Sequence, residues 1–325
     1  MYYLRLSSDM LLTLTKLTNS SDQLLILMCS MNGEAYLTQQ IESFIGQTDT
    51  AWSLTVSDDG STDMTMSILD KYQAKLGIDR VSISHGPRRG FAANFLTLAC
   101  KSGGAEYYAY SDQDDIWSPE KNALALKWLS GVRPGTPALY CARTEVVDAA
   151  AHHLGFSRIF TRTPSFANAL AQNIAGGNTM VFNDAARQLL ERAGSEIDVI
   201  AHDWWTYLVV SGCGGEVFYD PTPVLKYRQH GSNLIGANHT FLAPFTSVQR
   251  LLEGSFREWT SRNIAALNSI EQYLTPKNRA VLREFEAARN SGLFSRVRGI
   301  VKSGIYRQTR MGNIGLAVAT LFRRI

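Results

Sequence analysis

Strand-like and helical patterns alternate over the first part of the chain, and this alternation constrains the fold more than any other feature. Leu24–Cys29 is a continuous apolar run, as expected for a strand covered on both faces. Further strands are predicted at Trp52–Ser57, Val81–Ser84 and Glu106–Ser111, with amphipathic helices between them. This order predicts an α/β fold with a mostly parallel central sheet flanked by helices.

Polar clusters follow three of these predicted strands. SMNGE follows the first strand, SDDGSTD the second and SDQDD the fourth. The carboxyl ends of parallel strands meet at one edge of a sheet, and ligands bind outside that edge. The three clusters are therefore expected to lie together and to form a site.

The pattern changes after Trp117 and again near residue 239. Residues 1–21 are predicted to be an N-terminal extension. Residues 22–238 are predicted to form one α/β domain with two halves, 22–117 and 118–238. Residues 239–325 are predicted to be a basic helical C-terminal segment, an appendage to the sheet.

Composition excludes several classes of protein. The four cysteines are far apart and form no CxxC pair, which disfavours zinc and disulfide frameworks and favours free thiols in the cytoplasm. No run of 18 uncharged apolar residues occurs, so no transmembrane helix is expected. Asp9 interrupts the apolar stretch near the N-terminus, so no signal peptide is expected. The basic residues match no nucleic-acid-binding module, so no nucleic-acid partner is predicted.

The strongest chemical signal is the run Asp112-Gln113-Asp114-Asp115 at a strand end. Three carboxylates in four residues repel one another unless a cation or solvent absorbs their charge. Such hard oxygen ligands suit Mg²⁺ or Mn²⁺, which can bridge protein carboxylates to a diphosphate. The alternative is a solvated acidic turn that caps the next helix.

Two further clusters carry charge beside this run. Asp58 could accept the imino N–H of a uracil or thymine ring, or could serve only in a turn. Arg88, followed by Asn94, could bind phosphate oxygens, because a guanidinium presents a fork of donors. The alternative for these basic residues is a solvated loop.

The second half of the chain offers a candidate base and candidate sugar contacts. Asp203 is followed by Trp204 and Trp205, which combines a carboxylate with flat apolar surfaces that stack on sugars. The alternative places the tryptophans in the core and Asp203 at a helix start. His230 is a candidate metal ligand or phosphate donor, although a lone histidine is more often structural.

Taken together, the motifs resemble the family 2 glycosyltransferases, which share the GT-A fold. The matching pieces are CSMNGEAYLTQQIESFIGQT, TVSDDGSTD, GFAANF, YSDQDDIWSPEK, GGNTMVF, HDWW and DPTPVLKYRQHG, in family order. They cover roughly residues 23–235. The motifs SDQDDIW, HDWW and YRQHG are most similar to those of the bacterial rhamnosyltransferases of that family.

The resemblance implies a role for each matching position. Residues 22–117 would bind the nucleotide and residues 118–238 the acceptor. Nucleotide-sugar contacts are implied at Cys29, Met31, Glu34, Asp58, Arg88, Asn94, Asp112 and Gln113. Metal ligands are implied at Asp112 and Asp114, with His230 as the further candidate, and Trp204 and Trp205 are candidates for acceptor contact. Relatives usually place an aromatic such as Tyr where this chain has Met31.

The implied reaction is an inverting transfer of a sugar to an acceptor hydroxyl, with Asp203 as the catalytic base. The resemblance favours dTDP-rhamnose as donor, with a UDP-sugar as the alternative. It favours a bacterial surface glycan or lipid-linked oligosaccharide as acceptor. Two other classes remain open: a sugar-phosphate nucleotidyltransferase and a non-catalytic glycan- or nucleotide-binding subunit.

The end of the chain is basic and apolar together. No Asp or Glu occurs after Glu286, while eight Lys or Arg residues follow. Apolar residues lie among them: Ile300, Val301, Ile314, Leu316, Val318 and Leu321. Such a segment suits an anionic membrane surface, and peripheral attachment to the cytoplasmic face of the inner membrane is expected. The alternative is that this apolar surface packs on the protein or on a second subunit.

Overall fold

The computed structural model describes residues 23–230 and 255–325. The predicted N-terminal extension and the boundary at residues 238/239 lie outside these residues. One nine-stranded sheet organises the described part, with strand order β3-β2-β1-β4-β8-β6-β9-β5 and β7 paired to β6. The predicted strands are present and parallel: β1 (Leu24–Ser30), β2 (Trp52–Asp58), β3 (Val81–His85) and β4 (Tyr107–Ser111).

The second half of the sheet is mixed. β8 (Val181–Asn183) runs antiparallel between β4 and β6 (Ala138–Val147). β9 (Glu216–Arg228) is parallel to β6, and β5 (Ile116–Trp117) and β7 (His153–Phe156) are antiparallel edge strands. Because β8 is antiparallel to both β4 and β6, β4 and β6 point the same way and end at the same edge of the sheet.

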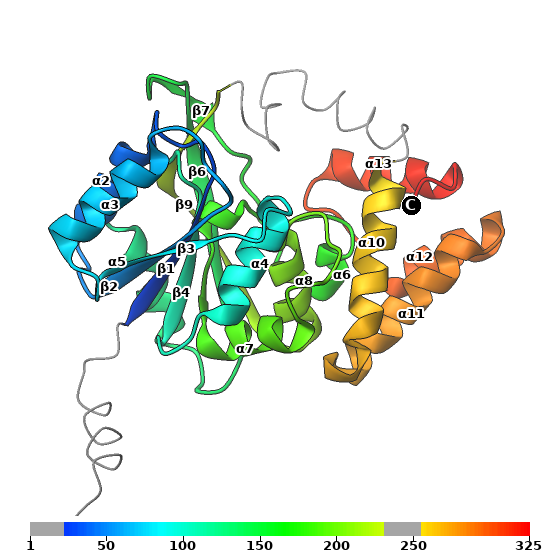
Figure 1. The fold of residues 1–325 in the computed structure, drawn as a ribbon. Coiled ribbons are helices and arrows are strands. Elements are labelled where there is room, and N and C mark those ends of the chain that lie inside the picture. The colour runs from blue at the N-terminus through cyan, green and yellow to red at the C-terminus, as the bar shows by residue number, and fades with distance from the viewer. Residues whose placement is uncertain (1–22, 231–254) are drawn as a thin grey trace, which may run out of the picture.

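Helices cover both faces of the sheet (Figure 1). One face packs against α2 (Leu37–Ile45), α3 (Thr65–Leu76) and α5 (Lys121–Leu129). The other packs against α4 (Phe91–Lys101), α7 (Asp184–Ala193) and α8 (His202–Gly212). In β1, Ile26 and Met28 belong to the first core, whereas Leu27 and Cys29 belong to the second. This two-sided burial is the reason that residues 24–29 of the strand are all apolar.

The predicted C-terminal appendage is helical in its described part. It consists of α10 (Ser255–Ser269), α11 (Pro276–Asn290), α12 (Leu293–Ser303) and α13 (Arg310–Leu321). Leu267 and Phe285 are fully buried and belong to the same core cluster as α4 and α8. Asn278 Nδ2 also donates to the carbonyls of Ser211 and Gly212, both at 3.0 Å. The helices are therefore joined to the sheet domain by a shared core.

Part of the basic charge of this segment is turned inward. Arg289 and Arg296 are 7% and 5% exposed. Arg296 donates to the carbonyls of Thr320 (3.0 Å) and Ser291 (2.9 Å), and Arg289 donates to Arg257 O (2.8 Å). These arginines satisfy main-chain carbonyls between helices, so they do not contribute to the surface charge that the sequence predicts.

Candidate active site

The loops that follow β1 and β4 are joined by one side chain. Gln113 Oε1 accepts from Met31 N (2.9 Å), and Gln113 Nε2 donates to Met31 O (2.9 Å). The amide thus mimics a neighbouring strand and fixes the two loops side by side. Gln113 therefore links the two loops in this structure. The Met31 side chain is 56% exposed and is accessible to a nucleobase.

The loops that follow β1 and β2 are joined by a second set of bonds. Asn32 takes a left-handed φ of 50°, and its Oδ1 accepts from Thr62 N (2.8 Å). Glu34 Oε2 accepts from Met64 N at the start of α3 (2.9 Å), while Asp63 Oδ2 accepts from Glu34 N (3.0 Å). This reciprocal pairing occupies Glu34 in loop structure. The predicted strand-end clusters therefore lie together, as the sequence indicated.

Asp58 stands at the end of β2 and is 2% exposed. Its Oδ1 accepts from the N–H groups of Gly60 (3.0 Å) and Ser61 (2.8 Å), and its Oδ2 accepts from the hydroxyls of Ser30 (2.8 Å) and Ser61 (2.6 Å). Burial alone raises the pKa of Asp58, but these bonds outweigh it and hold the pKa below its ordinary value. A carboxylate has about four acceptor sites, so a pyrimidine N–H would have to replace one of these bonds.

Arg88 lies beyond β3, exposed and with a positive φ of 56°. Its backbone N–H donates to Asp59 Oδ1 (2.6 Å). A Cβ added to Gly60 would come within 3.0 Å of Arg88 Nε, so the guanidinium lies directly over the turn after β2. This position brings positive charge to the strand-end loops, and a phosphate contact by Arg88 stays a prediction.

Asn94 is in a different environment from the one that the sequence predicted. It is 1% exposed on α4, and both ends of its amide bind Ser57. Nδ2 donates to Ser57 O (3.0 Å) and Oδ1 accepts from Ser57 Oγ (2.5 Å). Asn94 fixes the start of α4 against the end of β2, so direct contact with a nucleotide would require both bonds to break.

Four carboxyl groups crowd the end of β4. Burial, followed by the charges of Asp114 and Asp203, raises the pKa of Asp112 to about 8. Asp115 is fully buried, and burial with the charges of Asp114 and Asp112 raises its pKa well above the ordinary value. Asp115 accepts from Asn178 Nδ2 (2.6 Å) and from Arg228 N (3.2 Å). Burial and the neighbouring carboxylates thus favour the protonated form of Asp112 when no cation is bound.

The donors present fit a divalent cation shared with a ligand. Within residues 23–230 and 255–325, no three His, Cys, Asp or Glu side chains are grouped to hold a metal by themselves. Mg²⁺ usually binds one or two carboxylates and completes its shell with water and substrate phosphate, which Asp112 and Asp114 can accommodate. His230 Nε2 lies 2.8 Å from Asp114 Oδ2, and so this histidine holds Asp114 in the structure.

The start of α8 presents Asp203 to these carboxylates. Its Oδ2 accepts from Gly177 N (3.1 Å) and its Oδ1 from Trp204 N (2.6 Å). Burial raises the pKa of Asp203 to about 6, against the opposing effect of these bonds and one from Asn173. The charge of Asp203 contributes to the raised pKa of Asp112, so the two carboxyl groups lie close enough to interact electrostatically.

The predicted sugar contacts of Trp204 and Trp205 are wrong. Trp204 is 6% exposed, and its Nε1 donates to Ala169 O (2.7 Å). Trp205 is fully buried in the core between α8 and the sheet. Because successive residues of a helix point about 100° apart, Asp203 can face the site while both rings face the core. The alternative that placed the tryptophans in the core is correct.

Arg228 and Asn178 also support the site, and neither was among the predicted site residues. Arg228 is 2% exposed; its Nε donates to Asp114 O (2.9 Å) and its Nη1 to Ala149 O (2.7 Å). Arg228 lies in the motif YRQHG and Asn178 in the motif GGNTMVF, and membership of these motifs was the only feature of the sequence that could have indicated their role. They hold the backbone and side chains of the acidic run in place.

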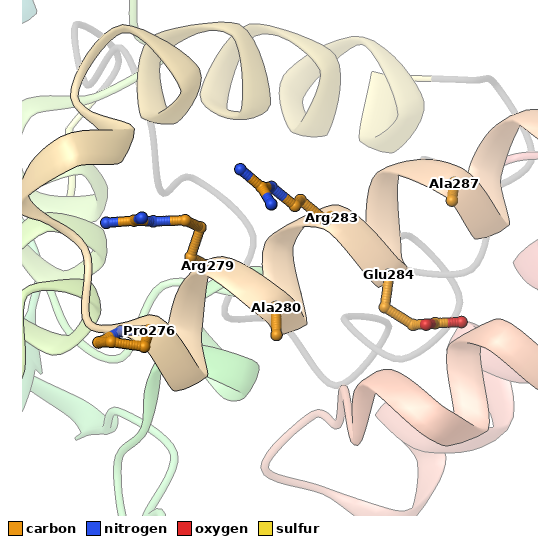
Figure 2. Close-up of a pocket in the computed structure, with 6 residues that line it drawn as sticks. All are labelled: Pro276, Arg279, Ala280, Arg283, Glu284 and Ala287. Atoms are coloured by element: carbon orange, nitrogen blue, oxygen red, sulfur yellow. The ribbon is translucent and has the colours of Figure 1, made fainter.

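Two shallow hollows lie away from these loops. Figure 2 shows the first, of about 510 Å³, along α11, lined by Pro276, Arg279, Ala280, Arg283, Glu284 and Ala287. Arg279 donates to Leu274 O and Arg283 to Glu271, so both charges are engaged. The second, of about 470 Å³, lies beside Trp128 and Phe218. Neither hollow is lined by a strand-end loop.

Comparison with known proteins identifies the family of the chain. The family model described as "Glycosyl transferase family 2" matches residues 25–189, which is about half of the chain and contains β1 to β4 and the acidic run. The chain belongs to the family 2 glycosyltransferases. It is 28% identical over 252 residues to the dTDP-rhamnosyl transferase RfbG of Shigella flexneri, covering 74% of this chain and 84% of that protein.

Two further similarities extend over most of the chain. An uncharacterized glycosyltransferase of Rickettsia typhi, RT0329, is 23% identical over 255 residues and 75% of each chain. The crystal structure of S. aureus TarS 1-349 superimposes with a TM-score of 0.51 at 14% identity, covering 86% of this chain and 89% of that one. The GT-A fold is therefore confirmed. No helix in the described parts of this glycosyltransferase is long and apolar enough to cross a membrane.

Proposed function

We propose that this glycosyltransferase is a metal-dependent, inverting enzyme that transfers rhamnose from dTDP-rhamnose to a hydroxyl of a glycan or lipid-linked acceptor. The observation that carries the proposal is the buried carboxyl group of Asp203, which lies close enough to the acidic run to raise the pKa of Asp112. A single displacement requires a base close to the group that holds the leaving diphosphate. The similarity to a dTDP-rhamnosyl transferase supports the donor.

The nucleotide would lie across the strand-end loops. The exposed Met31 side chain would offer an apolar surface to the nucleobase, and Cys29, two residues earlier in the chain, is buried near the end of β1. Burial, with the charges of Asp112 and Asp59, raises the pKa of Cys29 well above its ordinary value, so the thiol is neutral. Arg88, which lies over the turn after β2, would approach the phosphates.

The acidic run would bind the diphosphate end of the donor. A divalent cation held by Asp112 and Asp114 would stabilise the negative charge that grows on the leaving nucleoside diphosphate. His230 and Arg228 orient Asp114 from its side chain and its backbone respectively. Gln113 holds the loop after β1 beside the acidic run, so the sites for the nucleobase and for the diphosphate are kept at a fixed separation.

Asp203 would remove the proton of the acceptor hydroxyl as that oxygen attacks the anomeric carbon. A pKa of about 6 suits this task, because the carboxyl is ionised near neutral pH yet is more basic than an ordinary aspartate. The Gly177 and Trp204 N–H groups fix the orientation of the carboxylate. Attack from the face opposite the leaving group inverts the configuration of the sugar, and the transition state has oxocarbenium character.

The proposal is tested by thermal stability with dTDP, UDP, GDP or CMP, each with Mn²⁺ or with EDTA. At a ligand concentration of ~100 Kd the stabilisation is about 2.7 kcal/mol, which raises the Tm by roughly 5 °C. We expect this shift for dTDP with Mn²⁺ and its loss with EDTA or in Asp114→Ala. The exposed Asp79, on the turn before β3, provides the matched control Asp79→Ala. An equal shift with EDTA would contradict the metal, and no shift with any nucleotide would contradict the donor class.

A further inference from the structure

Exposed apolar side chains gather in two segments that are distant in the sequence. The first is the strap, defined here as residues 153–162, where Leu154, Phe156 and Ile159 are 58%, 48% and 48% exposed. The second is α13 with the residue after it, where Ile314 and Phe322 are 56% and 67% exposed. Phe and Leu side chains left in water at these fractions carry a hydrophobic cost that a partner would relieve.

The end of the strap contacts the segment that precedes α13. Arg162 N donates to Gln308 Oε1 (3.2 Å), and Gln308 Nε2 donates to Arg162 O (3.1 Å). The Arg162 guanidinium also lies 4.0 Å from the centre of the Tyr306 ring. Residues 306–308 lead directly into α13, so these contacts join the two apolar segments.

Positive charge predominates on this surface, although Glu145 of β6 pairs with Phe156 and its Oε1 lies 2.8 Å from His153 Nδ1. No Asp or Glu occurs between Ala149 and Asn183, nor after Glu286. Arg158 and Arg162 are exposed on the strap, and Arg310, Arg323 and Arg324 are exposed at the two ends of α13. Apolar side chains rimmed mainly by arginine complement an anionic interface that is apolar beneath.

The surface lies on the side of the candidate active site. The turn that precedes β7 contacts the acidic run through Arg228, which donates to both Ala149 O and Asp114 O. Figure 1 places β7 and α13 toward the upper side of the molecule, where the parallel strands end. A flat partner on the strap and α13 would therefore lie beside the site.

Two of the apolar residues that the sequence assigned to a membrane surface are excluded from it. Ile300 and Leu316 are 8% and 4% exposed and belong to the core, whereas Ile314 and Leu321 of α13 are more than half exposed. The tail alone thus presents a smaller apolar surface than its composition indicates. The strap supplies further exposed apolar side chains, which the composition of the C-terminal segment could not indicate.

We propose that the strap and α13 together form a docking surface for an anionic phospholipid bilayer. Docking by both elements turns the carboxyl edge of the sheet toward the lipid headgroups. The consequence for acceptor use, namely that a lipid-linked acceptor is reached without leaving the membrane, rests on the proposed function. The docking itself does not.

The test is co-sedimentation of the full chain with vesicles of phosphatidylcholine alone or with phosphatidylglycerol, without any nucleotide sugar. We expect binding to the anionic vesicles that weakens at high salt. Phe156→Ser on the strap and Phe322→Ser after α13 should each lower the partition coefficient by roughly tenfold, since each removes a large apolar contact. Ile78→Ser is the matched control, because Ile78 is 74% exposed on the turn after α3.

Four outcomes overturn the proposal. They are no binding, equal binding to neutral vesicles, a strap variant that behaves like Ile78→Ser, and a dimer in light scattering that both Phe variants dissociate. The last result would assign the surface to a second copy of the chain. Nucleotide-dependent thermal shifts should be unchanged in both variants, so failure of the docking and failure of the donor assignment are distinguished.

Discussion

Replacing Asp203 by Asn should strongly reduce transfer and, at neutral pH, stabilise the protein. The carboxyl is buried beside Asp112, and its pKa is raised from 3.8 to about 6. That difference corresponds to about 3 kcal/mol between the folded and unfolded environments. Asn carries no charge, but it keeps one acceptor oxygen for the two N–H groups of Gly177 and Trp204. Allowing about 1 kcal/mol or more for the lost bond leaves a net gain of about 1–2 kcal/mol.

The sign of the pH dependence follows from the raised pKa. Between about pH 4 and pH 6 the folded wild type binds a proton at Asp203 that the unfolded chain has released. Its free energy of unfolding therefore falls as the pH rises through this window, and stays lower above it. The Asp203→Asn variant does not lose free energy of unfolding in this window. Its stability advantage over wild type should therefore be full at pH 7.5 and should disappear near pH 4.

Urea unfolding of both proteins at the two pH values measures the stability difference, with Asp79→Asn as the exposed control. Donor turnover should fall by about 10²–10⁴-fold in Asp203→Asn, because a general base is lost, while nucleotide-dependent thermal shifts persist. Wild-type turnover should also decline below pH ~6 as Asp203 is protonated. A variant less stable than wild type at pH 7.5 would refute the energetic reasoning, and undiminished turnover would refute the assignment of the base.

Two further substitutions separate structural from functional contacts. Trp205→Ala should lower the free energy of unfolding by about 3–5 kcal/mol, because the ring is fully buried; a loss of acceptor affinity with unchanged urea stability would instead restore the sugar-stacking role. Gln113→Ala removes both bonds to the Met31 backbone, so KM for the donor should rise severalfold with little change in kcat. A fall in kcat at constant KM would place Gln113 at the reacting atoms.

The sequence predicted the architecture around β1 to β4 because local patterns encode it. An unbroken apolar run such as Leu24–Cys29 requires burial on both faces, and a polar cluster that follows such a run must lie at the sheet edge. The ordered motifs likewise sufficed to identify the family. These features depend on residues close together in the chain, so one sequence is enough to recognise them.

The roles of single side chains were less accessible, since they depend on which partners the fold supplies. Asn94 is polar and follows a basic loop, yet its amide is bound by Ser57 of a neighbouring strand. Asp58 likewise has both carboxylate oxygens engaged within its own turn and by Ser30. A pattern reports that a residue is polar, but it does not report whether its hydrogen bonds are already satisfied.

Tertiary structure alone decided the orientation of α8 and the distribution of the C-terminal charge. The run His202–Trp205 is compatible with aromatic rings in the site or in the core, and packing of α8 against the sheet selected the core. Arg296 and Arg310 are equally basic in sequence, yet one is buried on helix carbonyls and the other is exposed. The physical reason is the same in both cases: side-chain direction is set by contacts between elements that are far apart in the chain.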